Sequence, residues 1–298
     1  MFPRMRVLVT GAAGLLGSAA IKHLHAAGHG VVATDQRHAA GLPVPLHQVD
    51  LADDMGVYNL FHSGGGVDAV LHLGNIPNPN QPLPRQKLLA ANVGMTANVL
   101  YAAGDHGVER IVYASSIQAT MDMVAWPKWF EPQGPCPFPR LPMDGNAPAA
   151  PGQNPYALSK AHGEQLLAEL CRANAKLAGV ALRLPGICGR TGWNPPRRPF
   201  HAGCHELIEG MALLHLDDAC RLFEAALLRS PPGYRCHFPA SCRAVAGIAP
   251  ATLAREFLPH IPVTGDLRGP GGLADLGVLR DELGWTPLEP TPLLWPKA

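Results

Sequence analysis

Short apolar runs alternate with longer segments of helical periodicity along the first half of the chain. The apolar runs predict buried strands at residues 6–10, 31–34, 47–49, 67–73 and 110–114, and a later one at 180–184. Apolar residues recur at helical spacing over about residues 15–27, 88–103 and 156–172. Strands that are apolar on both faces and separated by helices indicate a parallel sheet covered on both sides. We therefore expect an α/β protein with a doubly wound sheet.

The pattern changes in the second half of the chain. A stretch rich in Pro and Gly over residues 121–154 is too long for an ordinary connection, which indicates a substrate loop or disorder. Asn154 can cap the helix that follows, and Pro155 suits its first turn. Asp217 and Asp218 predict the N-terminal cap of a further helix over residues 219–228.

The composition is that of an ordinary globular protein. Hydrophobic residues make up 47% of the 298 residues, and the formal net charge is +1. This balance gives no indication of a nucleic-acid partner, and no apolar run is long enough to span a bilayer. The seven cysteines include no Cys-x-x-Cys pair and no secretory signal is visible, which favours a cytoplasmic location. His201, Cys204 and His205 have no second cluster that would complete a tetrahedral set, so we expect no metal site.

A glycine-rich turn directly follows the first strand. Gly11, Gly14 and Gly17 can supply a tight turn, close approach of the backbone to a pyrophosphate, and close packing of the next helix. Their spacing differs by one residue from the usual dinucleotide fingerprint of a Rossmann-type domain. Asp35 follows the second strand, where a carboxylate binds the ribose hydroxyls of NAD and repels the 2′-phosphate of NADP. Arg37 could accept that phosphate instead, but we give Asp35 more weight.

Tyr156 and Lys160 share one face of a predicted helix because they are four residues apart. A tyrosine hydroxyl has an ordinary pKa near 10, so it needs a neighbouring positive charge to act as a base at neutral pH. With Lys160 beside it, Tyr156 can remove the proton from a substrate hydroxyl while the carbon gives hydride to a nicotinamide. Ser116 closes the fifth strand, where its hydroxyl can bind the same substrate oxygen or can simply cap the turn.

These features together resemble the extended short-chain dehydrogenase/reductases, the NAD-dependent sugar epimerase/dehydratase family. The matching segments are TGAAGLLG at 10–17, VVATD at 31–35, VDL at 49–51, VLHLGN at 70–75, NVGMTANVLYAA at 92–103, VYASS at 112–116, NPYALSK at 154–160 and LHLDDACR at 214–221. The resemblance extends over essentially the whole chain, but its motifs are specific only in the N-terminal two-thirds. It implies that residues 1–184 form an NAD-binding Rossmann domain and residues 185–298 a small substrate-binding region, with about 214–240 returning to the first domain.

The same resemblance implies roles for individual residues. Ser116, Tyr156 and Lys160 would be the catalytic triad. The residues expected to bind NAD are Gly11, Ala13, Gly14, Leu15, Leu16, Gly17, Asp35, Asp50, Leu51, Leu73, Gly74, Asn92, Tyr156, Lys160 and Pro185. The residues expected to bind substrate are Asn75, Ser116, Ile117, Gln118, Gly186 and Arg190. Asp50 has a second interpretation, as the cap of the following turn. A homodimer would form through the helices that carry Tyr156 and Asn92.

Departures from the family pattern narrow the expected reaction. Ile117 and Gln118 follow Ser116 where family dehydratases have an Asp-Glu pair, which disfavours dehydration. Gly186 stands where nucleotide-sugar epimerases commonly have asparagine, and the short tail leaves little room for a UDP group. We therefore expect an oxidoreductase acting on a hydroxyl of a free sugar or sugar acid, as uronate dehydrogenases do. The alternatives are a UDP-sugar 4-epimerase with tightly bound NAD and a non-catalytic NAD-binding regulatory protein.

Overall fold

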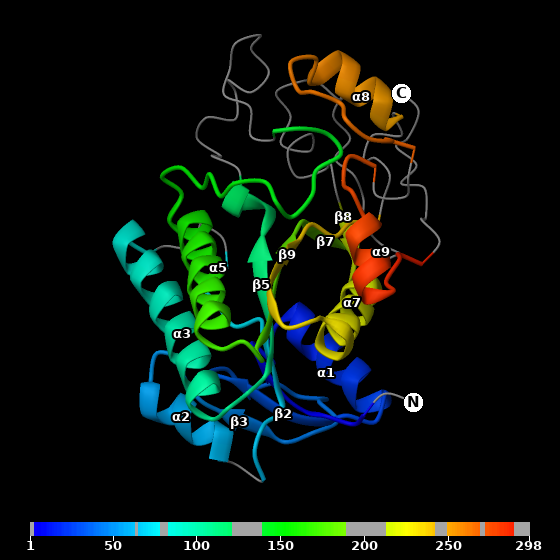
Figure 1. Ribbon diagram of the computed structural model, residues 1–298. Helices are drawn as coiled ribbons and strands as arrows, with labels where there is room; N and C mark the ends of the chain where they lie inside the picture. The colour runs from blue at the N-terminus through cyan, green and yellow to red at the C-terminus, as the bar shows by residue number, and fades with distance from the viewer. Residues whose placement is uncertain are drawn as a thin grey trace.

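A seven-stranded parallel sheet forms the centre of the molecule in the computed structural model (Figure 1). The structure describes residues 3–62, 65–77, 83–120, 139–188, 213–241, 249–268 and 272–288. In spatial order the strands are β3 (Leu46–Gln48), β2 (Gly30–Asp35), β1 (Arg6–Thr10), β4 (Ala69–His72), β5 (Arg110–Ser116), β6 (Ala178–Leu184) and β9 (Gly233–His237). Strand order reverses between β1 and β4, and in such sheets ligands bind at that point beyond the carboxyl ends of the strands. The prediction of a doubly wound α/β fold is confirmed.

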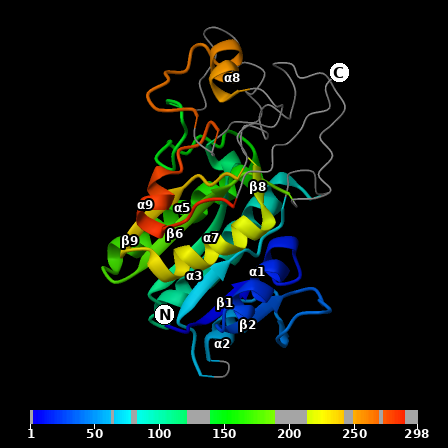
Figure 2. The same ribbon diagram turned by 90° about the vertical axis from the view of Figure 1, so that its right-hand side faces the viewer.

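Helices cover both faces of the sheet, as the two views in Figures 1 and 2 show. One face carries α1 (Leu15–Ala26) and α7 (Leu216–Arg229), which pack against each other. The other face carries α2 (Asp54–His62), α3 (Arg85–Asp105) and α5 (Pro155–Ala173). Each layer encloses its own cluster of buried apolar side chains, so the strands are apolar on both sides.

The start of α5 follows the prediction. The side chain of Asn154 accepts hydrogen bonds from the backbone N of Tyr156 (3.0 Å) and Ala157 (3.3 Å), and Pro155 occupies the first turn. This cap fixes where the helix begins, and the helix packs against β5 and the short 3₁₀ helix η1 (Ile117–Thr120) that follows it. Tyr156 is thereby held near the carboxyl end of β5.

One prediction about a helix was wrong, and another helix was missed. The helix α7 begins at Leu216 rather than Ala219, and no side chain caps it. Asp218 is fully buried and accepts hydrogen bonds from Ser241 Oγ (2.8 Å) and the backbone N of Leu288 (2.9 Å), so it ties distant segments together instead. The helix α2 was not predicted at all, because only its three buried residues mark it as amphipathic.

The remaining elements lie beyond β6 in the chain. They are β7 (Gly186–Cys188), β8 (Leu213–His215), α8 (Pro250–Phe257) and α9 (Gly277–Leu283). In the described part of the Pro-rich stretch, Leu141 and Met143 are buried and form bridges to Val263 and Ala274. Because β9 pairs with β6, part of the tail lies in the main sheet, although the proposed division into two domains stays a prediction. Among the described residues, no helix is both long and apolar enough to cross a membrane.

Candidate active site

The glycine-rich turn between β1 and α1 is packed too closely for side chains. Gly11 has a φ of +71°, and a Cβ added there would lie 2.9 Å from the backbone N of Gly74. A Cβ on Gly17 would lie only 2.1 Å from the carbonyl oxygen of Gly11. The first turn of α1 has no side-chain cap and no acidic residue, so its backbone N–H groups and the positive end of the helix dipole can receive an anion.

Asp35 lies beside this turn at the end of β2. Its carboxylate is 7% exposed and accepts hydrogen bonds from the backbone N of Ala13 (3.0 Å) and Arg37 (2.9 Å). Nε of Arg37 also lies 3.4 Å from this carboxylate, while most of the arginine side chain is exposed. The turn and the carboxylate are therefore one hydrogen-bonded unit, as a dinucleotide site requires.

A series of buried polar side chains supports the glycine-rich turn. The hydroxyl of Thr10 accepts hydrogen bonds from the backbone N of Leu73 (3.1 Å) and Gly74 (2.9 Å), so its own proton is directed to Nδ1 of His72 (2.7 Å). Nε2 of His72 then donates to the hydroxyl of Thr96 (3.3 Å). Burial, with a smaller contribution from Lys160, lowers the pKa of His72 to about 3, so this imidazole is neutral. This series of hydrogen bonds holds the ends of β1 and β4 together at the point where the strand order reverses.

Ser116, Tyr156 and Lys160 come from two adjoining elements, the end of β5 and the start of α5. The hydroxyl of Ser116 accepts a hydrogen bond from the backbone N of Gln118 (3.2 Å), which leaves its proton available for another acceptor. Nζ of Lys160 donates to the carbonyl oxygen of Ala114 (2.7 Å) and lies 5.7 Å from the centre of the Tyr156 ring. A cation at this position can stabilise negative charge on the tyrosine oxygen.

Lys160 is almost completely buried. Its exposed fraction is 3%, and burial lowers its pKa to about 7, although Glu164 opposes this shift. Glu164 follows Lys160 by one helical turn and is engaged by other groups. Its carboxylate accepts hydrogen bonds from Ser115 Oγ (2.5 Å) and from Nε (2.9 Å) and Nη2 (2.8 Å) of Arg183. The negative charge of Glu164 therefore offsets only part of the cost of burying the Lys160 ammonium.

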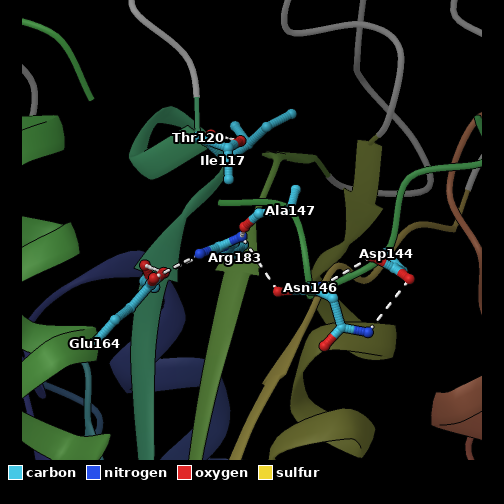
Figure 3. A network of polar contacts seen from close by, with 9 residues as sticks. Ile117, Thr120, Asp144, Asn146, Ala147, Glu164 and Arg183 are labelled. Atoms are coloured by element: carbon cyan, nitrogen blue, oxygen red, sulfur yellow. Dashed lines mark hydrogen bonds and ion pairs between the residues drawn. The ribbon is translucent and has the colours of Figure 1, made fainter. Parts of the chain in front are cut away.

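The Glu164–Arg183 pair also fixes the segment that leads into α5 (Figure 3). Nη1 of Arg183 donates to the carbonyl oxygens of Ala147 (2.6 Å) and Gly145 (3.3 Å), and both charged side chains are about 95% buried. Burial alone would lower the pKa of Arg183, but hydrogen bonding to Glu164 outweighs it and keeps this pKa above its ordinary value. The pair thus connects β6, α5 and the chain segment before Asn154.

Asn92 on α3 holds the segment after β4. Its amide accepts a hydrogen bond from the backbone N of Ile76 (2.8 Å) and donates to the carbonyl oxygen of Ile76 (3.0 Å) and to Ser159 Oγ (3.3 Å). The side chain of Asn75 donates to the carbonyl oxygen of Ile76 as well (3.3 Å). Because Ser159 lies between Tyr156 and Lys160 on α5, Asn92 connects the segment after β4 with that face of α5.

The other predicted site residues lie around the same edge of the sheet. Leu51 packs against Gly74, since a Cβ on that glycine would lie 2.5 Å from Leu51 Cδ1. The carboxylate of Asp50 accepts a hydrogen bond from the backbone N of Ala52 (2.9 Å), so it caps the turn that follows. Ile117 is buried in η1, and Gln118 accepts a hydrogen bond from Asn154 Nδ2 (3.2 Å). Pro185 joins β6 to β7, and Gly186 is the first residue of β7.

Some of the residues singled out from the sequence cannot be placed. Arg190, His201, Cys204 and His205 lie outside the described residues. Sequence reasoning also missed Glu164, Thr10 and His72 as structural supports of the site. Part of the signal for Glu164 was available, because it continues the Tyr156–Lys160 face of the helix by four residues, but the sequence does not show its contact with Arg183.

One known protein family matches most of this chain. The model of the NAD dependent epimerase/dehydratase family matches residues 7–213. The chain belongs to this family. Among relatives, the 2-alkyl-3-oxoalkanoate reductase of Stenotrophomonas maltophilia is 35% identical over 182 residues, 60% of this chain and 50% of the relative. The uronate dehydrogenase of Pseudomonas syringae pv. tomato is 31% identical over 167 residues, 55% of this chain and 53% of the relative.

A further relative of the family, the UDP-glucose 4-epimerase of Mus musculus, is 28% identical over 197 residues, 60% of this chain and 52% of the relative. The chain thus spans about half the length of the curated relatives it matches. Among solved structures, the glucuronic acid dehydrogenase of Chromohalobacter salexigens is 25% identical with a TM-score of 0.64, over 97% of this chain and 85% of that one. These relatives include dehydrogenases, reductases and epimerases, so membership of the family does not by itself define one reaction.

Proposed function

We propose that this enzyme transfers hydride between NAD and a carbon that carries a hydroxyl or oxo group, with Tyr156 as the acid/base group. The observation that carries the proposal is the buried Lys160 ammonium site, 5.7 Å from the centre of the Tyr156 ring at the carboxyl end of the sheet. The glycine turn and Asp35 supply a fitting site for the dinucleotide at the same edge. NAD, when bound, would accept or return the hydride.

The proposed roles of the three catalytic residues follow from their surroundings. Tyr156 takes the proton from the substrate hydroxyl during oxidation and returns it during reduction. Lys160 favours the phenolate form of Tyr156 and is held in place by the carbonyl oxygen of Ala114. Ser116 donates its hydroxyl proton to the same substrate oxygen. Ile117 is apolar and Gln118 carries no charge, so neither offers the additional acid that dehydration requires.

We infer that the substrate is a small hydroxy or oxo acid, with a sugar acid as the first candidate. Two relatives, at 35% and 31% identity, are named for an oxoalkanoate and a uronate, and both names describe carboxylates. Gly186 and the short connection after it favour a compact substrate over a nucleotide sugar. Arg190 is our candidate for binding the carboxylate, because arginine can form paired hydrogen bonds with it.

A second candidate function is 4-epimerisation of a UDP-sugar with retained NAD, which the similarity to the mouse epimerase favours. The two functions differ in their products. An oxidoreductase changes the redox state of NAD in each turnover, whereas an epimerase returns the hydride and leaves NAD unchanged overall. The proposed homodimer through α3 and α5 is compatible with either function and stays a prediction.

A substrate panel distinguishes these functions. Purified enzyme is incubated with NAD and glucuronate, galacturonate, a 3-hydroxyalkanoate, glucose, UDP-glucose or UDP-galactose, and with NADH and a 3-oxoalkanoate. Absorbance at 340 nm and product stereochemistry are followed together. We expect a change at 340 nm with an acid and none with the UDP-sugars. Inversion of a UDP-sugar without a change at 340 nm would refute the proposal in favour of the epimerase, and NAD binding without turnover would favour a regulatory protein.

A further inference from the structure

Two histidines far apart in the sequence meet at the ends of two helices. His62 is the last residue of α2, and His106 caps the C-terminus of α3. Their Nε2 atoms lie 3.0 Å apart, although 44 positions separate the residues in the chain. The ring of Tyr58 contacts the His106 ring edge-on at 4.4 Å between centroids, and Phe61 stacks on His106 at 5.2 Å. The aromatic neighbours therefore fix the orientation of the pair.

Hydrogen bonding defines which nitrogen of each ring faces the other. Nδ1 of His106 lies 2.8 Å from the carbonyl oxygen of Ala102, and a carbonyl can only accept, so Nδ1 carries the proton. Nε2 of His106 is consequently an unprotonated nitrogen with a lone pair directed at His62. Metal-binding histidines characteristically use one ring nitrogen for the ion and donate the other N–H to a carbonyl or carboxylate. His106 already has this arrangement.

The distance between the two nitrogens suits a shared cation. Bonds from imidazole nitrogen to Zn²⁺ are about 2.0–2.1 Å long. Two such ligands lie about 2.9 Å apart at a right angle and about 3.3 Å apart in a tetrahedron, and the observed separation of 3.0 Å falls between them. Both imidazoles also lie at helix C-termini, where the partial negative charge of the helix dipole favours a cation.

We propose that His62 and His106 form a surface binding site for one divalent transition-metal ion, such as Zn²⁺ or Ni²⁺, through their two Nε2 atoms. In binding, the Nε2 proton of His62 moves to its Nδ1, so both rings stay neutral and no oxidation state changes. Within the part of the chain that the structure describes, no third His, Cys, Asp or Glu joins the pair, so water completes the coordination. We therefore expect a Kd of about 1–100 µM, weaker than that of a four-ligand structural site.

The ion would connect α2 to α3 at a distance from the proposed chemistry. The C-terminal ends of α2 and α3 lie at the bottom of Figure 1. Strand β5 runs upward from there to η1, at the edge of the sheet where the proposed catalytic residues lie. The site is independent of NAD and substrate binding. Its expected effect is stabilisation of the contact between the two helices, because an ion that binds only the folded protein raises its stability.

Calorimetry with untagged full-length protein tests the site, with NiCl₂ and ZnCl₂ as separate titrants in a non-chelating buffer. We expect one ion per chain at the stated affinity and a rise in Tm of about 2 °C at a tenfold excess of ion over Kd. His62→Gln and His106→Gln should each weaken binding at least tenfold. His162→Gln is a matched control, because His162 is an exposed helical histidine whose Nδ1 also lies 2.7 Å from the carbonyl oxygen four residues earlier.

A second measurement needs no variant. Bound Ni²⁺ should protect His62 and His106 from diethyl pyrocarbonate but leave His162 reactive, as read by mass spectrometry. Three results would overturn the proposal: unaltered affinity in His62→Gln or His106→Gln, absence of binding by the unaltered protein, or equal modification of all three histidines with and without Ni²⁺.

Discussion

Replacing Lys160 with methionine should make the protein more stable while removing its activity. Burial lowers the pKa of Lys160 from an ordinary 10.5 to about 7, which corresponds to a cost of about 5 kcal/mol for burying the ammonium. Methionine fills a similar volume without charge. The variant loses the hydrogen bond to the carbonyl oxygen of Ala114, which offsets about 1–3 kcal/mol of the gain. The net gain at pH 6 is therefore about 2–4 kcal/mol, or about 3–6 °C in Tm.

The gain should depend on pH in a defined direction. The pKa of Lys160 is lower in the folded than in the unfolded chain, so the unfolded chain binds the extra proton between pH 7 and about pH 10. The contribution of Lys160 to the free energy of unfolding therefore rises with pH across that window. The full cost of burying its ammonium group applies only below pH 7. The advantage of Lys160→Met over the wild type should be largest at pH 6 and should shrink steadily towards pH 9.

Urea unfolding of both proteins at pH 6, 7, 8 and 9 measures this difference. Lys22→Met is the control, because Lys22 is exposed on α1 and its replacement should change the free energy of unfolding by less than about 0.5 kcal/mol. A Lys160→Met protein that is no more stable than wild type at pH 6, or one whose advantage is the same at pH 6 and pH 9, would refute the reasoning.

Three further variants test other parts of the structure. Gly17→Ala places a Cβ 2.1 Å from a backbone oxygen, so it should destabilise the fold by about 1–3 kcal/mol and weaken NAD binding in a fluorescence titration. Glu164→Gln leaves the buried guanidinium of Arg183 without its counter-charge and should cost about 3–5 kcal/mol in urea unfolding. Asp35→Asn removes the charge that repels a 2′-phosphate, so the ratio of NADPH to NADH affinity should rise about tenfold.

Two of these variants have a matched control variant. Gly104→Ala makes the same change in α3 where nothing lies within 4 Å, so it should stabilise the helix rather than destabilise it. Glu169→Gln breaks an exposed pair with Arg172 and should change stability by less than about 1 kcal/mol. If Gly104→Ala lost as much stability as Gly17→Ala, or Glu169→Gln as much as Glu164→Gln, the assigned roles would be contradicted. An unchanged ratio of NADPH to NADH affinity in Asp35→Asn would contradict the role of that carboxylate.

The predictions that succeeded depend on local sequence patterns. The strand over residues 6–10, the glycine turn after it and the capped helix that begins at Pro155 are each set by residues close together in the chain. Such segments have a single periodicity and clear end signals, so their structure follows from neighbouring residues alone. The parallel sheet then follows from the alternation of strands and helices.

The features that were missed depend on contacts between distant residues. Asp218 was interpreted as a helix cap from its neighbours, but its buried carboxylate binds groups near residues 241 and 288. Glu164 and Arg183 meet only because α5 packs against β6. His62 and His106 likewise meet only after α2 packs on α3, so no spacing in the sequence indicated the pair.

The central claim is that Tyr156 exchanges the proton during hydride transfer, and Tyr156→Phe tests it most directly. The variant keeps the ring beside Lys160 and removes only the hydroxyl. With the best substrate from the panel, we expect kcat to fall by about 10²–10⁴-fold while the Kd for NAD changes less than about twofold. Turnover within a few-fold of wild type would contradict the claim, whatever the substrate proves to be.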